Sequence, residues 1–218
     1  IPVLDLPIHN TASIIKKRTF GPNIDTNIIL NEVLLSASKQ FGLIPVMKHI
    51  PGHGVTNRDS HFALPVSKFS ISELNRHLKI FKHFNHLPLA MTAHIKYLSW
   101  DKNNIATFSY KIINQIIRKN ANFKGLIMSD DLMMKANEFK ISEAISLSNK
   151  AGIDILLDCS SDWERYIEII KNFNITNKYK AKINLQLGKL NRSKFNNKSI
   201  NINHYHHLYN ELVKHYGI

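Results

Sequence analysis

The sequence predicts an α/β fold built on a parallel sheet, and three observations support this prediction. Short apolar runs alternate with segments of helical periodicity along the first 170 residues. Most of these runs are apolar throughout, which is typical of strands covered on both faces. Strands that alternate with helices favour parallel pairing, because each helix returns the chain to the start of the next strand. The residues alone leave open a doubly wound sheet or part of a (β/α)₈ barrel.

Five apolar runs are predicted to be strands, and they cover residues 1–5, 43–49, 87–94, 125–130 and 153–158. The first run begins at residue 1, which is Ile and not Met. We therefore expect the chain to begin in the middle of a fold.

Helical segments lie between these runs. Asp25 is expected to cap a helix over residues 26–40. Ser70 and Glu73 form an S-x-x-E capping box, which marks the start of a second helix. Four apolar residues of that helix fall on one face: Leu74, Leu78, Phe81 and Phe84.

Two later helices are predicted in the same way. Ser109 is expected to cap a helix with apolar positions at Ile112, Ile113, Ile116 and Ile117. Ser161 and Glu164 indicate a further capping box, ahead of Trp163, Tyr166, Ile167 and Ile170. The Asn- and Lys-rich residues 172–203 predict a loop with a short helix, and residues 204–216 predict a terminal helix.

The composition excludes several classes of protein. Hydrophobic residues make up 44% of the 218 residues and charged residues 21%, which is ordinary for a globular domain and excludes a wholly disordered chain. The apolar runs are far shorter than the roughly 20 residues of a membrane-spanning helix. Cys159 is the single cysteine, so an intrachain disulfide is excluded and a reducing compartment is allowed.

The net charge of +13 comes mainly from the end of the chain. Residues 171–218 hold nine Lys and Arg residues against one acid, Glu211, and form a basic tail. The abundance of Asn, Ile and Lys is typical of an AT-rich genome, so we interpret the tail as a solvated face. An anionic partner is the alternative. No nucleic-acid motif is present, and we expect no nucleic-acid partner.

Polar residues follow three of the predicted strands. They are Lys48 and His49, then Thr92 and His94, then Ser129, Asp130 and Asp131. Because the carboxyl ends of parallel strands lie at one edge, these groups are expected to converge. A buried strand has no structural need for a charged end, so the pattern predicts a functional site.

The segment 48–65, KHIPGHGVTNRDSHFALP, is predicted to be a loop, because Pro51 and two glycines interrupt any helix. Asp59 and His61 are close enough in sequence for the carboxylate to orient the imidazole for acid–base work. A polar surface loop with incidental histidines is one alternative. Zinc binding by His49, His53, Asp59 and His61 is another, although Pro51 and Gly52 remove helical ligand spacing.

Asp130 ends an apolar strand, where a fixed carboxylate can attack an electrophilic carbon or bind a cation. The alternative is that Ser129, Asp130 and Asp131 only cap the next helix. His94 is as consistent with a structural role as with a substrate contact. Arg18 alone would be a surface arginine.

Three of these segments together carry a family resemblance. KHIPGHGVTNRDSH…LP, MTAHIKY and FKGLIMSDDLMMKA resemble the bacterial β-N-acetylglucosaminidases of glycoside hydrolase family three, of the peptidoglycan-recycling type. The match spans about residues 1–160 and is most specific at 48–65 and 125–132. The resemblance implies a (β/α)₈ TIM-barrel type of fold that lacks its first strands, in one catalytic domain over 1–218.

The resemblance also implies roles for individual residues. Asp130 would be the nucleophile of a retaining mechanism, His61 the general acid/base and Asp59 its partner. Lys48, His49 and Arg18 would bind N-acetylglucosamine. Two departures from the family pattern are Ile50 in place of Phe and the lysines at 16–17 ahead of Arg18.

The expected activity is therefore that of a β-N-acetylhexosaminidase, which removes terminal β-N-acetylglucosamine from muropeptide fragments. The resemblance implies a cytoplasmic monomer with a small carbohydrate as its partner, no membrane span, and neither cofactor nor metal. Three alternatives are a broader family-three glucosidase, a metal-dependent hydrolase, and a truncated remnant that binds sugar or is inactive.

Overall fold

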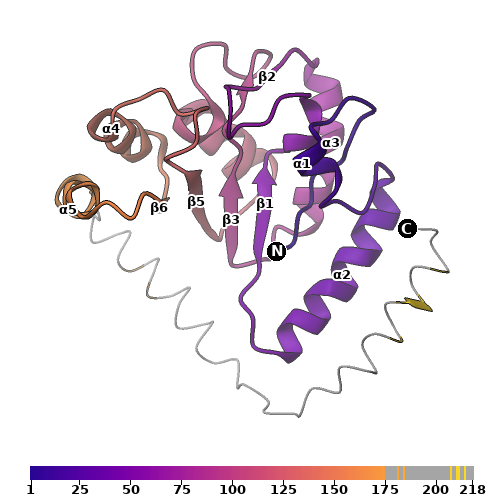
Figure 1. The fold of residues 1–218 in the computed structure, drawn as a ribbon. Coiled ribbons are helices and arrows are strands. Elements are labelled where there is room, and N and C mark those ends of the chain that lie inside the picture. Colours follow the sequence, from indigo (N-terminus) through magenta and orange to yellow (C-terminus); the bar gives the residue numbers. More distant parts are fainter. Residues whose placement is uncertain (175–180, 182–183, 185–206, 208–209, 212–213, 215–218) are drawn as a thin grey trace.

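The computed structural model describes residues 1–174 and the separate positions 181, 184, 207, 210, 211 and 214. Its centre is a four-stranded parallel sheet in the order β1-β3-β5-β6. The strands are β1 (Val46–Ile50), β3 (Leu89–Thr92), β5 (Leu126–Asp131) and β6 (Ile155–Leu157). Figure 1 shows β1 and β3 side by side and pointing the same way. The predicted parallel α/β sheet is confirmed.

The first predicted strand is shorter than expected. Residues 1–4 run parallel to β1, but Val3 forms only an isolated bridge with Lys48. The Leu4 N–H donates to the Lys48 carbonyl at 2.7 Å, and the Val46 N–H donates to the Ile1 carbonyl at 2.8 Å. A separate pair, β2 (Val66–Ser67) with β4 (Lys96–Tyr97), was not predicted, because two-residue strands have no periodicity to detect.

Helices connect the strands and cover the sheet (Figure 1). They are α1 (Ser13–Lys16), α2 (Ile24–Gln40), α3 (Ile71–His83), α4 (Ile141–Ala151) and α5 (Trp163–Asn172), with 3₁₀ turns η1 (His53–Val55) and η2 (Ala106–Phe108). The segment η3 (Ile112–Asn120) is a π-helix and not the expected α-helix. Ser109 caps it as predicted, because its Oγ accepts the Ile112 N–H at 3.0 Å.

The capping box of α3 is confirmed in both directions. Ser70 Oγ accepts the Glu73 N–H, and a Glu73 carboxylate oxygen accepts the Ser70 N–H at 2.8 Å. The apolar face that it introduces is buried, with Leu74, Leu78, Phe81 and Phe84 at most 1% exposed. These side chains belong to the main core, which α3 forms with the sheet.

Two other capping predictions are wrong. Asn23 and not Asp25 caps α2, since its side chain accepts the Thr26 N–H at 2.9 Å and the helix begins at Ile24. Asp162 caps α5, because its carboxylate accepts the N–H groups of Glu164 and Arg165. In both helices a neighbouring polar residue occupies the extended position from which a side chain reaches the first turn.

The apolar face expected on α5 is not buried among the described residues. Trp163 and Ile170 are 71% and 75% exposed, and none of the helix's residues is buried. Most of the loop predicted at 172–203 and of the helix predicted at 204–216 lies outside the described residues. Within the described part of the chain, no helix is long and apolar enough to cross a membrane.

Candidate functional site

The polar ends of β1, β3 and β5 meet at one edge of the sheet, as the sequence predicts. β3 lies between the other two strands, so Lys48 and Asp130 flank the end of β3. His94, which follows β3, connects the end of β5 to η2. Its Nε2 lies 3.1 Å from the Asp131 carbonyl oxygen, and its Nδ1 lies 2.8 Å from Thr107 Oγ1. The His94 ring is fully buried, and burial lowers its pKa. His94 is therefore a buried member of the framework at this edge.

Asp130 is 8% exposed at the end of β5. One carboxylate oxygen accepts the Asp131 N–H at 3.0 Å, and the other accepts no hydrogen bond from the described residues. The backbone N–H groups that a capping residue would accept are bonded to the neighbours of Asp130 and not to Asp130 itself. Asp131 accepts the N–H groups of Met133 and Cys159, while Ser129 Oγ accepts the Leu157 N–H. Asp130 thus retains an oxygen for chemistry at the sheet edge.

The Lys48 side chain lies within electrostatic range of Asp130. Burial lowers the pKa of Lys48, the Arg18 charge lowers it further, and the charges of Asp130 and Asp5 oppose this shift. The same interactions place the Arg18 guanidinium near Lys48, although Arg18 itself is exposed. Of the predicted site residues, Arg18 and Asp130 are therefore both close enough to Lys48 for their charges to shift its pKa.

Asp5 is a residue that the sequence analysis did not select. Its side chain is completely buried and accepts the N–H groups of His49 and His53, the latter at 2.5 Å. Burial alone would raise the pKa of Asp5, but the charges and hydrogen bonds of His49 and His53 lower it overall. Asp5 ends the first apolar run, so the strand-end rule applied to the other strands would have found it.

Asp5 also orients the His49 ring. A carboxylate oxygen of Asp5 lies 2.7 Å from His49 Nδ1, with both side chains buried. An ionised carboxylate only accepts hydrogen bonds, so Nδ1 carries the proton. His49 Nε2 is the nitrogen left for another partner. This orientation resembles the carboxylate–imidazole contact that sets a tautomer in many enzymes.

His53 connects the sheet edge to the loop that carries Asp59 and His61. It is 1% exposed, and its Nε2 lies 3.2 Å from Ser60 Oγ. Burial and the nearby His49 lower the pKa of His53 to about 4, so the ring is neutral at pH 7. The Ser60 carbonyl accepts the Ala136 N–H at 3.1 Å, which fixes the loop to the segment after β5.

The predicted contact between Asp59 and His61 is present. Asp59 Oδ1 lies 2.6 Å from His61 Nδ1 and accepts the His61 N–H at 2.9 Å. Partial burial opposes ionisation of Asp59, but the hydrogen bonds from His61 lower its pKa overall. The pair is open to solvent, with side-chain exposures of 53% for His61 and 24% for Asp59. Within the described residues, no hydrogen bond joins His61 to Asp130.

The zinc alternative finds no support in the geometry. His49 contacts Asp5, His53 contacts Ser60, and His61 contacts Asp59. The described residues contain no group of three or more His, Cys, Asp or Glu side chains that could hold a metal ion.

The fold and this edge define a parallel α/β protein with carboxylates, imidazoles and cations gathered at the carboxyl ends of its strands. Residues 1–190 match the family described as the glycosyl hydrolase family 3 N terminal domain. The chain therefore belongs to that family, and its fold is of the (β/α)₈ TIM-barrel type.

Named relatives agree with this assignment. A beta-hexosaminidase of Psychromonas ingrahamii is 34% identical over 183 residues, which cover 80% of this chain and 52% of that protein. NagZ from Neisseria gonorrhoeae, solved in complex with N-trifluoroacetyl-D-glucosamine, is 31% identical with a TM-score of 0.74, covering 85% of this chain and 54% of that one. The chain thus spans about half the length of the relatives it matches.

A third relative was solved with zinc bound. It is CbsA from Thermotoga neapolitana, which is 33% identical with a TM-score of 0.74, covering 91% of this chain and 45% of that chain. The described residues of the present chain contain no group of three or more metal-ligating side chains. We therefore assign no chemical step to a metal ion.

Proposed function

We propose that this chain is a retaining β-N-acetylhexosaminidase that removes terminal, non-reducing β-N-acetylglucosamine. One observation carries the proposal: nearly buried Asp130 keeps one carboxylate oxygen without a hydrogen bond from the described residues, at an edge that also holds Lys48. The beta-hexosaminidase relative and the glucosamine derivative in the NagZ complex support this substrate class.

In the proposed first step, Asp130 attacks the anomeric carbon, and the bond from that carbon to the leaving oxygen breaks. The leaving oxygen takes a proton from the His61 imidazolium, which Asp59 stabilises. In the second step, neutral His61 takes a proton from water while that water attacks the same carbon. Asp130 leaves as a carboxylate, so the configuration of the sugar is retained.

The acid/base assignment requires movement of a loop. His61 is half exposed, and among the described residues its ring is hydrogen-bonded only to Asp59 and to no residue of the buried edge. We infer that residues 56–61 close over the bound sugar and bring His61 to the leaving oxygen.

Three further residues are proposed to bind the sugar. Lys48 and His49 come from the end of β1, and Arg18 follows α1. The His49 Nε2 nitrogen, left available by the Asp5 contact, is suited to accept a hydrogen bond from a sugar hydroxyl. The Arg18 guanidinium and the Lys48 ammonium are suited to donate to hydroxyl and carbonyl oxygens.

The test is release of 4-methylumbelliferone from its β-N-acetylglucosaminide by the purified chain. Asp130→Asn is expected to abolish turnover while the protein stays folded. Glu138→Gln is the matched control, because Glu138 is an exposed acid a few residues further along the chain. Undiminished turnover in Asp130→Asn would disprove the assignment of Asp130 as the nucleophile. Faster hydrolysis of the aryl glucoside than of the aryl N-acetylglucosaminide would disprove the proposed substrate class.

The physiological setting is proposed on the resemblance of the motifs. The substrate would be N-acetylglucosaminyl-β-1,4-anhydro-N-acetylmuramic acid, with or without peptide, and the role would be peptidoglycan recycling by a cytoplasmic monomer. Hydrolysis of this disaccharide by the purified chain, followed by mass spectrometry, tests the substrate. Light scattering tests the monomer.

Sugar binding without turnover is the second candidate function. It is favoured by one observation, that the His61 side chain is 53% exposed and, among the described residues, makes its side-chain hydrogen bond only with Asp59. Calorimetric binding of N-acetylglucosamine by a chain that releases no 4-methylumbelliferone would support this candidate over the hydrolase.

A further inference from the structure

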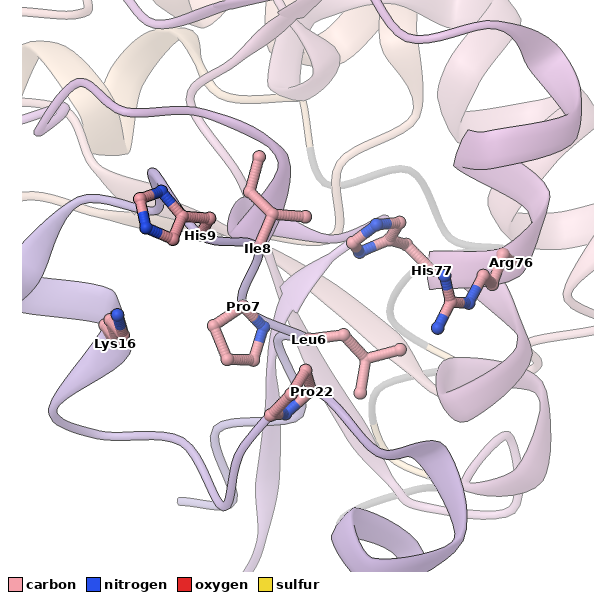
Figure 2. Close-up of a pocket in the computed structure, with 8 residues that line it drawn as sticks. All are labelled: Leu6, Pro7, Ile8, His9, Lys16, Pro22, Arg76 and His77. Atoms are coloured by element: carbon pink, nitrogen blue, oxygen red, sulfur yellow. The ribbon is translucent and has the colours of Figure 1, made fainter.

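A cavity of about 380 Å³ opens beside the segment that follows Asp5. Its walls come from three places in the sequence: Leu6–His9, the region of α1 and its following loop, and the middle of α3. Figure 2 shows Arg76 and His77 on one side of the cavity, His9 and Lys16 on the other, and Pro7, Leu6 and Pro22 between them. None of the residues proposed for hydrolysis lines it.

The lining combines positive charge with an apolar floor. Lys16 and Arg76 supply basic side chains, and no Asp or Glu is among the lining residues. Neither cation forms a salt bridge within the described part of the chain. Leu6, Pro7 and Ile8 supply the apolar surface. Two cations that line one cavity without acidic partners favour the binding of an anion there.

His77 adds a polar group at the inner wall. The residue is 6% exposed, its ring is directed toward the cavity in Figure 2, and its Nδ1 has no hydrogen-bond partner among the described residues. Burial and the neighbouring Arg76 lower the pKa of His77 to about 4, so the ring is neutral at pH 7. A buried, unpartnered polar atom costs free energy. Because Nδ1 is closed to solvent, a ligand in the cavity would reach it only after the ring turns about its Cβ–Cγ bond.

We propose that this cavity binds a small organic anion, whose charge is attracted by Lys16 and Arg76 and whose apolar body packs on Pro7 and Ile8. The cavity volume falls within the range of small-molecule sites. Neutral His77 orients the ligand by a hydrogen bond, while the two cations supply the attraction.

This site is connected to the sheet edge by direct packing. Leu6 lines the cavity and follows Asp5, which holds His49 and His53. A Cβ built on Gly52 would meet the His77 Cβ at 3.4 Å, so the η1 segment packs against the cavity wall. Occupation of the cavity is therefore expected to stabilise the segment that carries His49 and His53.

The experiment uses phenylacetate as the anionic probe and phenylacetamide as its uncharged counterpart. Binding is followed on the full chain by ¹H–¹⁵N NMR, with the amide signals of Ile8 and His77 as the local readout. Phenylacetate is expected to shift both signals in a saturable way. Phenylacetamide is expected to bind at least about tenfold more weakly, because the attraction of the two cations is lost.

Three variants locate the site. Lys16→Gln and Arg76→Gln are each expected to weaken phenylacetate binding several-fold, and His77→Phe is expected to weaken it while preserving the ring's packing. Lys17→Gln and Lys79→Gln are matched controls, because these exposed lysines lie on or beside the same helices but do not line the cavity.

Two results would overturn the proposal: no saturable shift with phenylacetate in the wild-type chain, or equal binding by the cavity variants and the controls. Both results are independent of hydrolysis, which none of these variants is designed to alter.

Discussion

Replacing Asp5 with Asn tests whether this buried carboxylate holds the edge of the site in place. The substitution preserves the shape of the side chain and removes its charge. One side-chain oxygen still accepts the His53 N–H, whereas the new NH₂ group faces the His49 ring, which Asp5 contacts at 2.7 Å. The His49 ring must then change tautomer, so that Nδ1 accepts and Nε2 carries the proton.

The energetic cost follows from the contacts. A hydrogen bond to a charged group contributes about 1.5–3 kcal/mol, and the completely buried Asp5 makes such bonds to two residues. Because Asn keeps part of this hydrogen bonding, we expect Asp5→Asn to lower the free energy of unfolding by about 2–3 kcal/mol. Asp5→Ala leaves all these donors unpaired and is expected to cost about 3–6 kcal/mol.

The assay is urea unfolding followed by circular dichroism at pH 7. With a typical slope of about 1–3 kcal/mol per molar urea, Asp5→Asn is expected to shift the midpoint by about 1 M. Glu138→Gln is the control and is expected to lie within about 0.5 kcal/mol of wild type, because Glu138 is exposed. An Asp5→Asn midpoint equal to that of the control would refute the positioning role of Asp5.

The remaining predictions concern His53, His61, Gly54 and metal dependence. The pKa of His53 is about 4 in the folded protein against 6.5 for an ordinary histidine in the unfolded chain, so its contribution to stability is present above pH 6.5 and is lost as pH falls toward 4. Between pH 7 and pH 5 the free energy of unfolding of wild type should fall by about 2 kcal/mol more than that of His53→Gln, as measured by urea titration. The same pH dependence in both proteins would contradict this. His61→Ala should lower turnover of the aryl substrate by about 10²–10⁴-fold and change the pH–rate profile, whereas an unchanged profile would count against the acid/base role. A Cβ on Gly54 would lie 1.9 Å from the Leu6 carbonyl oxygen, so Gly54→Ala should strongly lower the thermal midpoint, while a wild-type midpoint would show that the two segments separate easily. EDTA should leave turnover unchanged, and inhibition that zinc reverses would revive the metal-dependent alternative.

The sequence predicts the local features of this fold well. The strands of the main sheet follow from short apolar runs, the buried face of α3 follows from its helical periodicity, and the Ser70–Glu73 box follows from a spacing of three. Where two polar residues compete for one helix start, as Asn23 and Asp25 do, the backbone conformation decides and the sequence does not record it. The exposed Trp163 shows a further limit, because an apolar periodicity does not reveal whether another element covers it.

Long-range partners were harder to predict than site positions. Lys48, His49 and Asp130 were selected because each lies at a strand end, and the strand order brings these ends to one edge. Asp5 also ends an apolar run and follows from the same strand-end rule, but its partners His49 and His53, 44 and 48 residues away, do not follow from that rule. Contacts of that separation depend on the packing of complete elements, which a single sequence does not specify.

The site divides into a buried part and an exposed part that a single histidine connects. Asp130 and His49 are fixed at the edge of the core, at 8% and 4% exposure, whereas the Asp59–His61 pair stands in solvent. His53 contacts both parts, through its N–H to Asp5 and its Nε2 to Ser60. A nucleophile benefits from a rigid position, while an acid/base must admit the sugar and then approach its leaving oxygen. Ser60 is held both by His53 at 3.2 Å and by the Ala136 N–H at 3.1 Å, so a movement of the loop at Ser60 would have to release both contacts, whereas the Asp5–His49 contact could stay in place.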